Sequence, residues 1–256
     1  MLILRRSSRL INLILLVSGV AWLVSYRQVG GLPSEDQIAP SLLRSPLQSE
    51  TTRPHFDFEY FKQIYLIQPL YDFDISGLIV AHNNVGGMTD AYHTSESVDL
   101  KDICLIWGDN FRDNLHQKLT FWSETWSCFY RYSSRELGAL FRPDQLSNNH
   151  LLSEKEDVRE KIRSARVGDQ IRMRGWLVNY ALKEFPERVR KTSTVRTDTG
   201  NGACEVVLVD DFYIINKWQA GWLALNQSVW FIMISALVLK LFAFLIFPYI
   251  EYRMSE

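Results

Sequence analysis

The sequence predicts a β-rich α+β protein, in which a small barrel-like domain with one or two helices is flanked by an N-terminal and a C-terminal transmembrane helix. Three observations predict this architecture. Each end of the 256-residue chain carries a long apolar stretch. Short β-prone runs separated by turns fill most of the region between them. One amphipathic helical pattern interrupts these runs.

The first apolar stretch, residues 10–25, predicts a transmembrane helix close to the shortest length that spans a bilayer. Three arginines lie within residues 1–9, and such a cluster favours a cytoplasmic N-terminus. A cleavable signal peptide would carry the same basic start and apolar run, so this alternative stays open. Both interpretations place the following region outside the cytoplasm.

The second apolar stretch, residues 222–250, predicts another transmembrane helix, followed by a cytoplasmic tail of residues 251–256. Lys240 interrupts it, and an ionisable group inside a membrane is a candidate functional residue. Three interpretations stay open. The ammonium reaches the cytoplasmic interface, it pairs with an acidic group of another helix, or it serves transport.

Composition and charge bound the environment of the middle region. Residues 26–55 are rich in Pro, Ser, Gln and Gly and predict a linker, which leaves residues 56–216 as an extracytoplasmic domain. The net charge of -1 lacks the basic excess typical of nucleic-acid binding, so no nucleic-acid partner is expected. We expect a bacterial inner-membrane protein with a periplasmic domain. Its expected partners are membrane lipid and other membrane proteins or further copies of the chain.

Six runs in the middle region have the alternation or the β-branched and aromatic content of strands. They are residues 64–68, 71–80, 103–107, 119–132, 170–180 and 205–215. A helix is predicted from Ser153 to Gly168, because Ser153 and Glu156 form a capping-box pattern. Strand density, turn spacing and this helix look like a small closed barrel of the oligonucleotide/oligosaccharide-binding (OB) type, which by itself implies no function.

Two polar runs, residues 147–152 and residues 192–205, contain the candidate catalytic residues. The residue types favour a thiol chemistry in which Cys204 is the nucleophile and His150 is the base. The candidates for orienting the histidine are Asn148, Asn149 and Asp198. The alternative interpretation is a hydrogen-bonded hairpin loop at the helix entry, with Cys204 as a small buried residue.

The same runs supply candidate binding residues, because Asn, Asp, Ser and Thr side chains offer many hydrogen-bonding groups. These candidates are Asn148, Asn149, His150, Arg196, Asp198 and Asn201. Arg196 ends a basic stretch that fits either an anion site or a solvated hairpin face. Asp198 also begins a D-T-G sequence like that of aspartic peptidases, but no apolar strand leads into it and no second copy exists.

No sequence motif for a metal or a cofactor accompanies these residues. The five histidines show no metal-ligand spacing, and no C-x-x-C or glycine-rich phosphate loop occurs. We therefore expect neither a metal nor a cofactor. Cys104 and Cys128 lie in neighbouring predicted strands and would pair in an oxidising compartment, leaving Cys204 as a thiol. In a reducing compartment all three would be thiols.

Several motifs together resemble a family of small membrane-anchored bacterial proteins. These motifs are LSNNHLL, VGDQIRMRGWLVNY and TSTVRTDTGNGACEVVLVD, with DICLIWGDN and FWSETWSCFY upstream. The resemblance covers roughly residues 71–212 and implies an extracytoplasmic domain tethered by an N-terminal anchor. The C-terminal apolar segment departs from the simplest members. The family has no established activity, so the resemblance assigns no catalytic residue.

The leading functional expectation is a membrane-anchored periplasmic domain for interaction, assembly or ligand binding, without enzymatic activity. It rests on two anchors and a β-rich domain in which the sequence displays no complete catalytic set. The alternative is a thiol-dependent hydrolase or transferase that uses Cys204 and His150. A third interpretation is a subunit of a larger membrane complex held together through Lys240.

Overall fold

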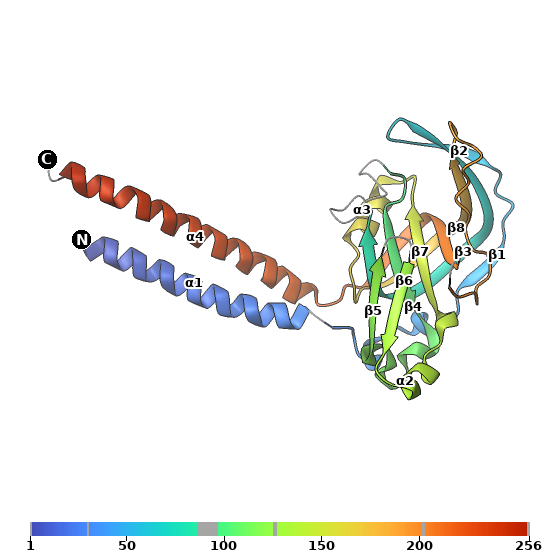
Figure 1. Cartoon of the computed structure of the whole chain (residues 1–256), viewed down its shortest axis with the longest axis horizontal. Coiled ribbons are helices and arrows are strands. Elements are labelled where there is room, and N and C mark those ends of the chain that lie inside the picture. The colour runs from blue at the N-terminus through green and yellow to red at the C-terminus, as the bar shows by residue number, and fades with distance from the viewer. Residues whose placement is uncertain (1, 30, 86–96, 125–126, 201–202, 255–256) are drawn as a thin grey trace. The chain divides into compact units, whose positions relative to one another are not determined.

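The computed structural model describes residues 2–29, 31–85, 97–124, 127–200 and 203–254 (Figure 1). The chain divides into two compact units. One contains both termini, Met1–Gly31 and Gln219–Glu256, and the other is Leu32–Trp218. The protein is therefore a mixed α+β protein with a large sheet and two apolar terminal helices, as the sequence predicts.

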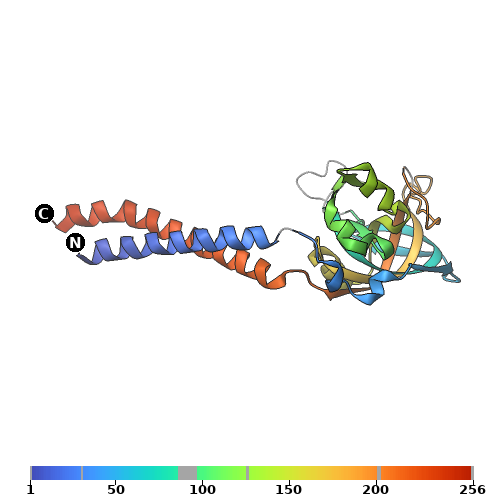
Figure 2. The ribbon, with the colours of Figure 1, turned by 90° about the horizontal axis from the view of Figure 1, so that it is seen from below.

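The terminal unit is a pair of long helices, α1 (Leu2–Val29) and α4 (Ala220–Met254), which lie side by side (Figures 1 and 2). Each contains a segment long and apolar enough to cross a membrane, Arg9–Val29 in α1 and Ala220–Ile246 in α4. The two helices run antiparallel: Asn12 near the start of α1 contacts Lys240 late in α4, and Ser25 near the end of α1 contacts Asn226 early in α4. Such length and composition match what a bilayer of about 30 Å requires of a spanning helix.

Two hydrogen bonds join the polar groups of these apolar helices. Lys240 Nζ donates to Asn12 Oδ1 at 2.9 Å, and Asn226 Nδ2 donates to Ser25 Oγ at 3.0 Å. Lys240 thus has a partner on another helix, but this partner is an amide of the same chain rather than an acidic group. Both Lys240 and Asn12 lie towards the same end of the two apolar segments, which fits an ammonium close to one membrane interface.

The middle unit contains a seven-stranded sheet and a separate two-stranded sheet. The large sheet consists of β1 (Leu47–Glu50), β2 (Phe56–Tyr60), β3 (Gln63–Asn84), β4 (Lys101–Ile106), β7 (Leu146–Leu152), β8 (Gln170–Leu182) and β9 (Cys204–Asn216). The small sheet is the hairpin of β5 (Leu119–Glu124) and β6 (Ser127–Tyr132). The helices are α2 (Arg135–Leu140) and α3 (Glu156–Ser164), with short 3-10 turns at Glu35–Gln37, Pro40–Leu43, Gly108–Lys118 and Pro143–Gln145.

The long strand β3 organises the sheet, because it pairs with two different neighbours. Its first part pairs with β8 and its last part pairs with β4. The strand order β1-β3-β4-β7-β9-β8 therefore returns to β3, while β2 pairs with β3 off this path. The pairs are antiparallel except β7 with β9, which are parallel.

The principal core fills the inner side of this sheet. Its fully buried members include Ile75, Ile103, Leu151 and Val207, from four different strands. Helix α3 contributes Val158 and Ile162 and the following Ala165, the apolar face that its sequence pattern predicts. The helix begins at Glu156, somewhat later than the capping-box pattern suggests, because the Ser153 hydroxyl donates to Val209 O and accepts from Lys155 N.

The segment predicted as a linker, residues 26–55, belongs largely to the two units. Its start completes α1, and its later part contains β1, which pairs with β3. Leu42 is fully buried against the second face of β3 and β4, together with Ile38. The apolar residues of this segment, although few, are placed so that they cover that face of the sheet. The overall polar composition of the segment, which predicted a linker, does not show this placement.

The polar run 147–152 is strand β7 at the centre of the sheet rather than a hairpin loop. Its residues from Ser147 to Leu152 are all buried. The run fits a strand because β4 and β9 satisfy its backbone groups on both sides, and because its polar side chains have partners of their own. Strands β1 and β2 have no counterpart among the predicted strand runs.

Candidate active site around Cys204

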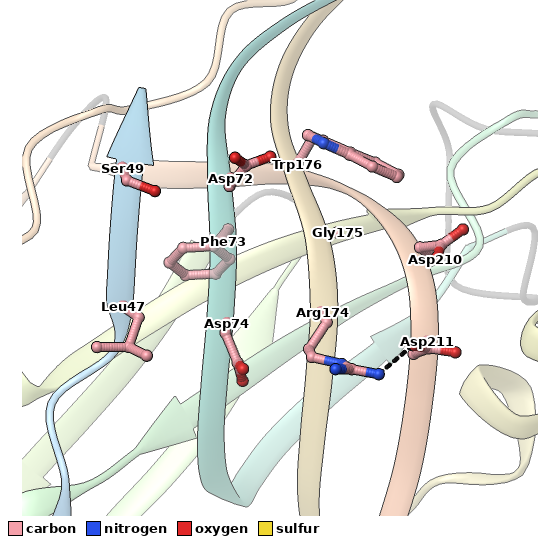
Figure 3. A pocket seen from close by; sticks show the side chains of 10 residues that line it. All are labelled: Leu47, Ser49, Asp72, Phe73, Asp74, Arg174, Gly175, Trp176, Asp210 and Asp211. Carbon is pink, nitrogen blue, oxygen red and sulfur yellow. Dashed lines mark hydrogen bonds and ion pairs between the residues drawn. The ribbon is translucent and has the colours of Figure 1, made fainter. Parts of the chain in front are cut away.

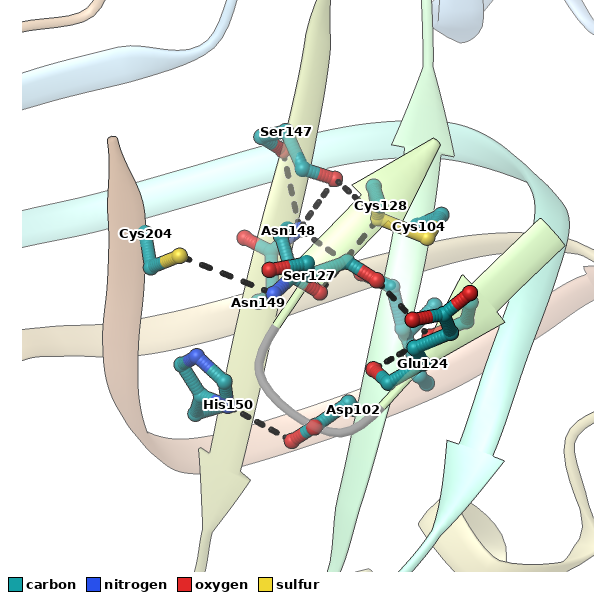
Figure 4. The surroundings of a disulfide bond; sticks show 12 residues. Asp102, Cys104, Glu124, Ser127, Cys128, Ser147, Asn148, Asn149, His150 and Cys204 are labelled. Atoms are coloured by element: carbon teal, nitrogen blue, oxygen red, sulfur yellow. Dashed lines mark hydrogen bonds and ion pairs between the residues drawn. A yellow bond between two sulfur atoms is a disulfide. The ribbon is translucent and has the colours of Figure 1, made fainter. Parts of the chain in front are cut away.

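Three neighbouring strands bring the candidate catalytic residues to one face of the sheet. In the pairing of β4 with β7, Asp102 lies opposite His150 and Cys104 lies opposite Asn148. In the pairing of β7 with β9, Asn148 lies opposite Cys204. Since alternate residues of a strand share a face, these five side chains project to the same side (Figure 4).

His150 is the centre of this arrangement. Its Nδ1 lies 2.6 Å from Asp102 Oδ1, and both side chains are almost fully buried, at 4% and 2% exposed respectively. The imidazole also forms a hydrogen bond with Cys204. On its other ring nitrogen, Nε2, it meets Arg190 NH2 at 3.0 Å.

These contacts set the proton affinity of the imidazole. Burial by itself would lower the pKa of His150. The hydrogen bonds to Asp102 and Cys204 and the negative charge of Asp102 outweigh burial and raise the pKa to about 9, with Arg190 opposing. A carboxylate on Nδ1 fixes the ring orientation and the tautomer. The arrangement therefore has the parts of a nucleophile, a base and an orienting acid.

Asn148 touches both sulfur-containing groups of the face. Its Nδ2 donates to Cys204 Sγ over 3.6 Å, and its Oδ1 lies 3.3 Å from Cys128 Sγ (Figure 4). Cys128 forms a disulfide with Cys104 and so ties the β5–β6 hairpin to β4. This is the pairing that the sequence predicts for an oxidising compartment, and Cys204 lies outside it.

A cavity of about 580 Å³ opens beside Cys204. Its lining residues are Ser127, Cys128, Phe129, Tyr130, Pro143, Leu146, Asn148, Asp198, Thr199, Gly200, Ala203 and Cys204. Of the described residues in this lining, Asp198 alone carries a charge. The volume lies within the range of roughly 300–1,000 Å³ that small-molecule sites occupy.

The segment before β9 is fixed by hydrogen bonds on both of its sides. Ser193 N donates to Cys204 O at 2.8 Å, and Val206 N donates to Thr192 Oγ1 at 2.9 Å. The Ser193 hydroxyl donates to Asp198 Oδ2. Asp198 is thereby held at the cavity wall and does not orient His150.

Two predicted site residues, Asn149 and Arg196, lie away from this face. Asn149 and Glu205 project to the inner side, where Arg196 NH1 forms an ion pair with Glu205 Oε1 at 2.7 Å. The Arg196 guanidinium also lies over the rings of Phe73 and Trp107. Burial raises the pKa of Glu205, although Arg196 acts against that rise. Arg196 and Asn149 therefore belong to the interior, and Asn201 lies outside the described residues.

Two residues that contact His150, Asp102 and Arg190, are not among the predicted site residues. Asp102 is the acidic member of the otherwise apolar run Ile103 to Ile106 and its predecessor, and a buried charge in such a strand requires a partner. That requirement was the available signal. Arg190 had no such signal, because it reaches the imidazole only through its bridge with Tyr180 on β8.

A second hollow, of about 430 Å³, lies over β1, β3, β8 and β9 (Figure 3). Its charged groups already have partners: Arg174 pairs with Asp211, Asp74 with Arg172 and Asp210 with Lys155, while Asp72 accepts a hydrogen bond from Thr51. Within the part of the chain that the structure describes, no cluster of three or more His, Cys, Asp or Glu side chains could hold a metal ion. The lining of this second hollow contains no nucleophile paired with a base, so the cavity at Cys204 is the stronger candidate.

Comparison with protein-family models, with curated proteins and with solved structures finds no match. The resemblance of the motifs to membrane-anchored bacterial proteins therefore stays a prediction. Two structural features, the fold and the candidate site, define the class of protein. The protein has a β-rich domain between two terminal helices that are each long and apolar enough to span a membrane, and this domain carries a buried Asp–His pair next to a cysteine.

Proposed function

We propose that the middle domain is a thiol-dependent acyl hydrolase or transferase. Cys204 is the nucleophile, His150 accepts and returns the proton, and Asp102 orients His150. The observation that carries the proposal is the series of side-chain hydrogen bonds from Asp102 through His150 to Cys204, with Cys204 on a cavity wall. Such series activate weak nucleophiles in unrelated folds.

The reaction proceeds in two balanced steps. The Cys204 sulfur attacks an ester, thioester or amide carbonyl while its proton passes to His150, and His150 then protonates the leaving group. Water or another acceptor attacks the resulting thioester, and Cys204 leaves as the thiol. With a pKa raised to about 9, His150 is a stronger base, but it accepts the Cys204 proton only from its neutral form, so acylation should become faster as the pH rises towards about 9. The Asn148 amide, which donates towards Cys204 Sγ, is placed to stabilise the oxyanion.

The finer description of the fold is an OB-like barrel. Support comes from five strands, β3-β4-β7-β9-β8, whose pairing returns to β3, from the parallel pair β7–β9, and from the position of α3 between β7 and β8. The proposed catalytic residues lie on β4 and β7 and at the start of β9. In OB-folds the ligand face is formed by the second and third strands and nearby loops.

The proposed location is the bacterial inner membrane, with residues 1–9 and the tail after α4 in the cytoplasm and the middle domain in the periplasm. The two apolar helices support membrane anchoring. The Cys104–Cys128 disulfide supports an oxidising compartment. The substrate would then be an acyl compound of the periplasm or of the membrane surface.

A second candidate function is an anchored interaction or assembly domain without catalysis. The contact of Arg190 with His150 Nε2 favours it, because the guanidinium occupies the ring nitrogen that Asp102 leaves available to a nucleophile. In that case the Asp102–His150–Arg190 series is a buried polar network that stabilises the sheet. Partners would be membrane lipid, other membrane proteins or another copy of the chain.

The experiment that separates the two functions uses the full chain in non-ionic detergent with p-nitrophenyl acetate. Hydrolysis with a stoichiometric burst is expected, and intact-mass spectrometry should show one acetyl group on Cys204. Cys204→Ala should abolish the burst, and His150→Ala should slow acylation by about 100-fold or more. The exposed His55 supplies a matched control, since His55→Ala should leave the rate unchanged.

Retention of the burst in Cys204→Ala would refute the proposed chemistry. Absence of acylation in the wild-type chain, together with unchanged folding of His150→Ala at all pH values, would also contradict the role of the Asp102–His150 pair. Capture of a defined membrane partner by the Cys204→Ala variant and by the wild type alike would favour the interaction domain.

A further inference from the structure

We propose that the cavity beside Cys204 selects acyl groups that carry a positive charge, and that Asp198 is the residue that selects them. This inference rests on the proposed function, because it names the class of substrate for that site. The bound group would be an ammonium or guanidinium on the acyl portion of the substrate. The argument depends on the walls of the cavity, on its charge and on the positions of the neighbouring cations.

The two walls of the cavity differ in chemistry. The β6 side and the segment before β7 provide an apolar and aromatic wall from Phe129, Tyr130, Pro143 and Leu146. The opposite wall is the polar stretch from Asp198 to Gly200, next to Cys204. A substrate that fills both halves therefore has an apolar body, a carbonyl group at the sulfur and a polar group that complements a carboxylate.

Asp198 keeps acceptor capacity for such a group. The Ser193 hydroxyl donates to Oδ2 and fixes the carboxylate, and a carboxylate can accept about four hydrogen bonds. The side chain is partly exposed, as access by a ligand requires. Binding an ammonium here would add a charge-assisted hydrogen bond, which is roughly twice as strong as a neutral one.

The neighbouring positive charges do not cancel this carboxylate within the cavity. Arg196 forms its ion pair with Glu205 on the inner side of the sheet. Arg190 meets His150 Nε2 and lines a different cavity, of about 370 Å³, on the side of Tyr65 and Tyr180. His150 itself is buried against Asp102 and is absent from the described lining. Among the described lining residues, the cavity therefore carries the single negative charge of Asp198.

The test uses charge-selective labelling of Cys204 in the full chain in non-ionic detergent. The probes are three methanethiosulfonates, namely the cationic 2-aminoethyl, the neutral methyl and the anionic 2-sulfonatoethyl reagents. In each reaction the Cys204 sulfur forms a disulfide with the alkylthio group of the reagent and displaces methanesulfinate, so the label needs no enzymatic turnover. Rates are followed by intact-mass spectrometry and divided by the rates of the same reagents with a small free thiol.

The expected result is a cation-to-anion rate ratio well above one for the wild type. Asp198→Asn should lower this ratio by about tenfold, since a single charge within about 4 Å attracts one reagent and repels the other. Asp198→Glu should retain most of the ratio. Glu187→Gln removes a charge from the same loop away from the cavity and should leave the ratio unchanged.

An unchanged ratio in Asp198→Asn, at an unchanged melting temperature, would overturn the selection by Asp198. The experiments distinguish a failure of this substrate assignment from a failure of the proposed function. If Asp198→Asn leaves the ratio unchanged while Cys204→Ala abolishes acylation, the chemistry stands and only the substrate class is wrong. If Cys204→Ala acylates like the wild type, the proposed function fails, and with it the assignment of an acyl substrate, whatever the ratio.

Discussion

At the scale of single residues, the site depends on how His150 balances burial against its partners. A histidine that is almost fully buried would normally lose its proton, because burial disfavours the charged form. Here the short contact with Asp102 and the hydrogen bond with Cys204 reverse that effect and raise the pKa to about 9. The same contacts that would support catalysis also link the stability of the fold to pH.

The sign of this linkage follows from the raised pKa. The folded state binds the His150 proton more tightly than the unfolded state, whose histidine pKa is about 6.5. The stabilisation is fully present below about pH 6.5 and is lost as the pH rises through about 9. Over this window the wild type should lose on the order of 3 kcal/mol of unfolding free energy more than His150→Gln.

The measurement is urea unfolding of both chains in non-ionic detergent, followed by tryptophan fluorescence at several pH values across that window. His150→Gln removes the titrating group while other groups, such as the buried Lys101, titrate in both chains and cancel in the difference. Parallel pH profiles for the two proteins would contradict a raised pKa of His150.

At the scale of elements, the β5–β6 hairpin is held to the large sheet by a covalent link. The disulfide joins Cys104 of β4 to Cys128 of β6. The hairpin supplies the apolar wall of the cavity through Phe129 and Tyr130, while β4 supplies Asp102. The disulfide therefore fixes one wall of the candidate site against the strand that orients its histidine.

Removing this disulfide should destabilise the middle domain. The bond closes a loop with a sequence separation of 24, for which chain entropy predicts about 3 kcal/mol. We expect this loss for Cys104→Ala combined with Cys128→Ala, measured as the change in unfolding free energy. Reduction of the wild type with dithiothreitol should reproduce the effect, whereas Cys204→Ala should not. A loss below about 0.5 kcal/mol would show that packing alone positions the hairpin.

At the scale of the whole molecule, both termini lie in one antiparallel pair of helices. Small and short side chains are buried between α1 and α4, namely Ser18, Ser25, Val229 and Ala236. Small residues allow two helices to approach closely where no hydrophobic effect drives association. The Lys240–Asn12 hydrogen bond adds a polar contact to this pair. The pair therefore has the features expected of a membrane hairpin.

The proposed topology makes a direct prediction for reporter fusions. Alkaline phosphatase, which needs disulfides, should be active when fused after Gly31 and inactive when fused after Glu256. A green fluorescent protein should show the opposite pattern. Replacing the three arginines of residues 1–9 with glutamine should weaken this orientation, because positive charges hold the N-terminus inside. An active phosphatase at Glu256 would contradict a cytoplasmic tail.

Local patterns in the sequence predicted a large part of the fold. The apolar length of both ends, the alternation along β3 and β8 and the apolar face of α3 are properties of neighbouring residues, so periodicity detects them. The pair Cys104–Cys128 was also within reach, because it joins strands close in sequence. Strand β7 escaped detection because most partners of its polar side chains come from segments distant in sequence, such as Asp102, Arg190 and Cys204.

Sequence alone identified Cys204 and His150 as candidates by their chemical types, but the residue that contacts His150 Nδ1 is not among the three candidates for orienting the histidine, Asn148, Asn149 and Asp198. The proposed orienting residues Asn149 and Asp198 point to the interior and to the cavity wall, respectively. Asp102 holds the imidazole instead. This assignment depends on strand register, since a shift of one residue would move Asp102 to the opposite face. The sequence determined which side chains were available, and the tertiary pairing of β4, β7 and β9 decided which of them meet.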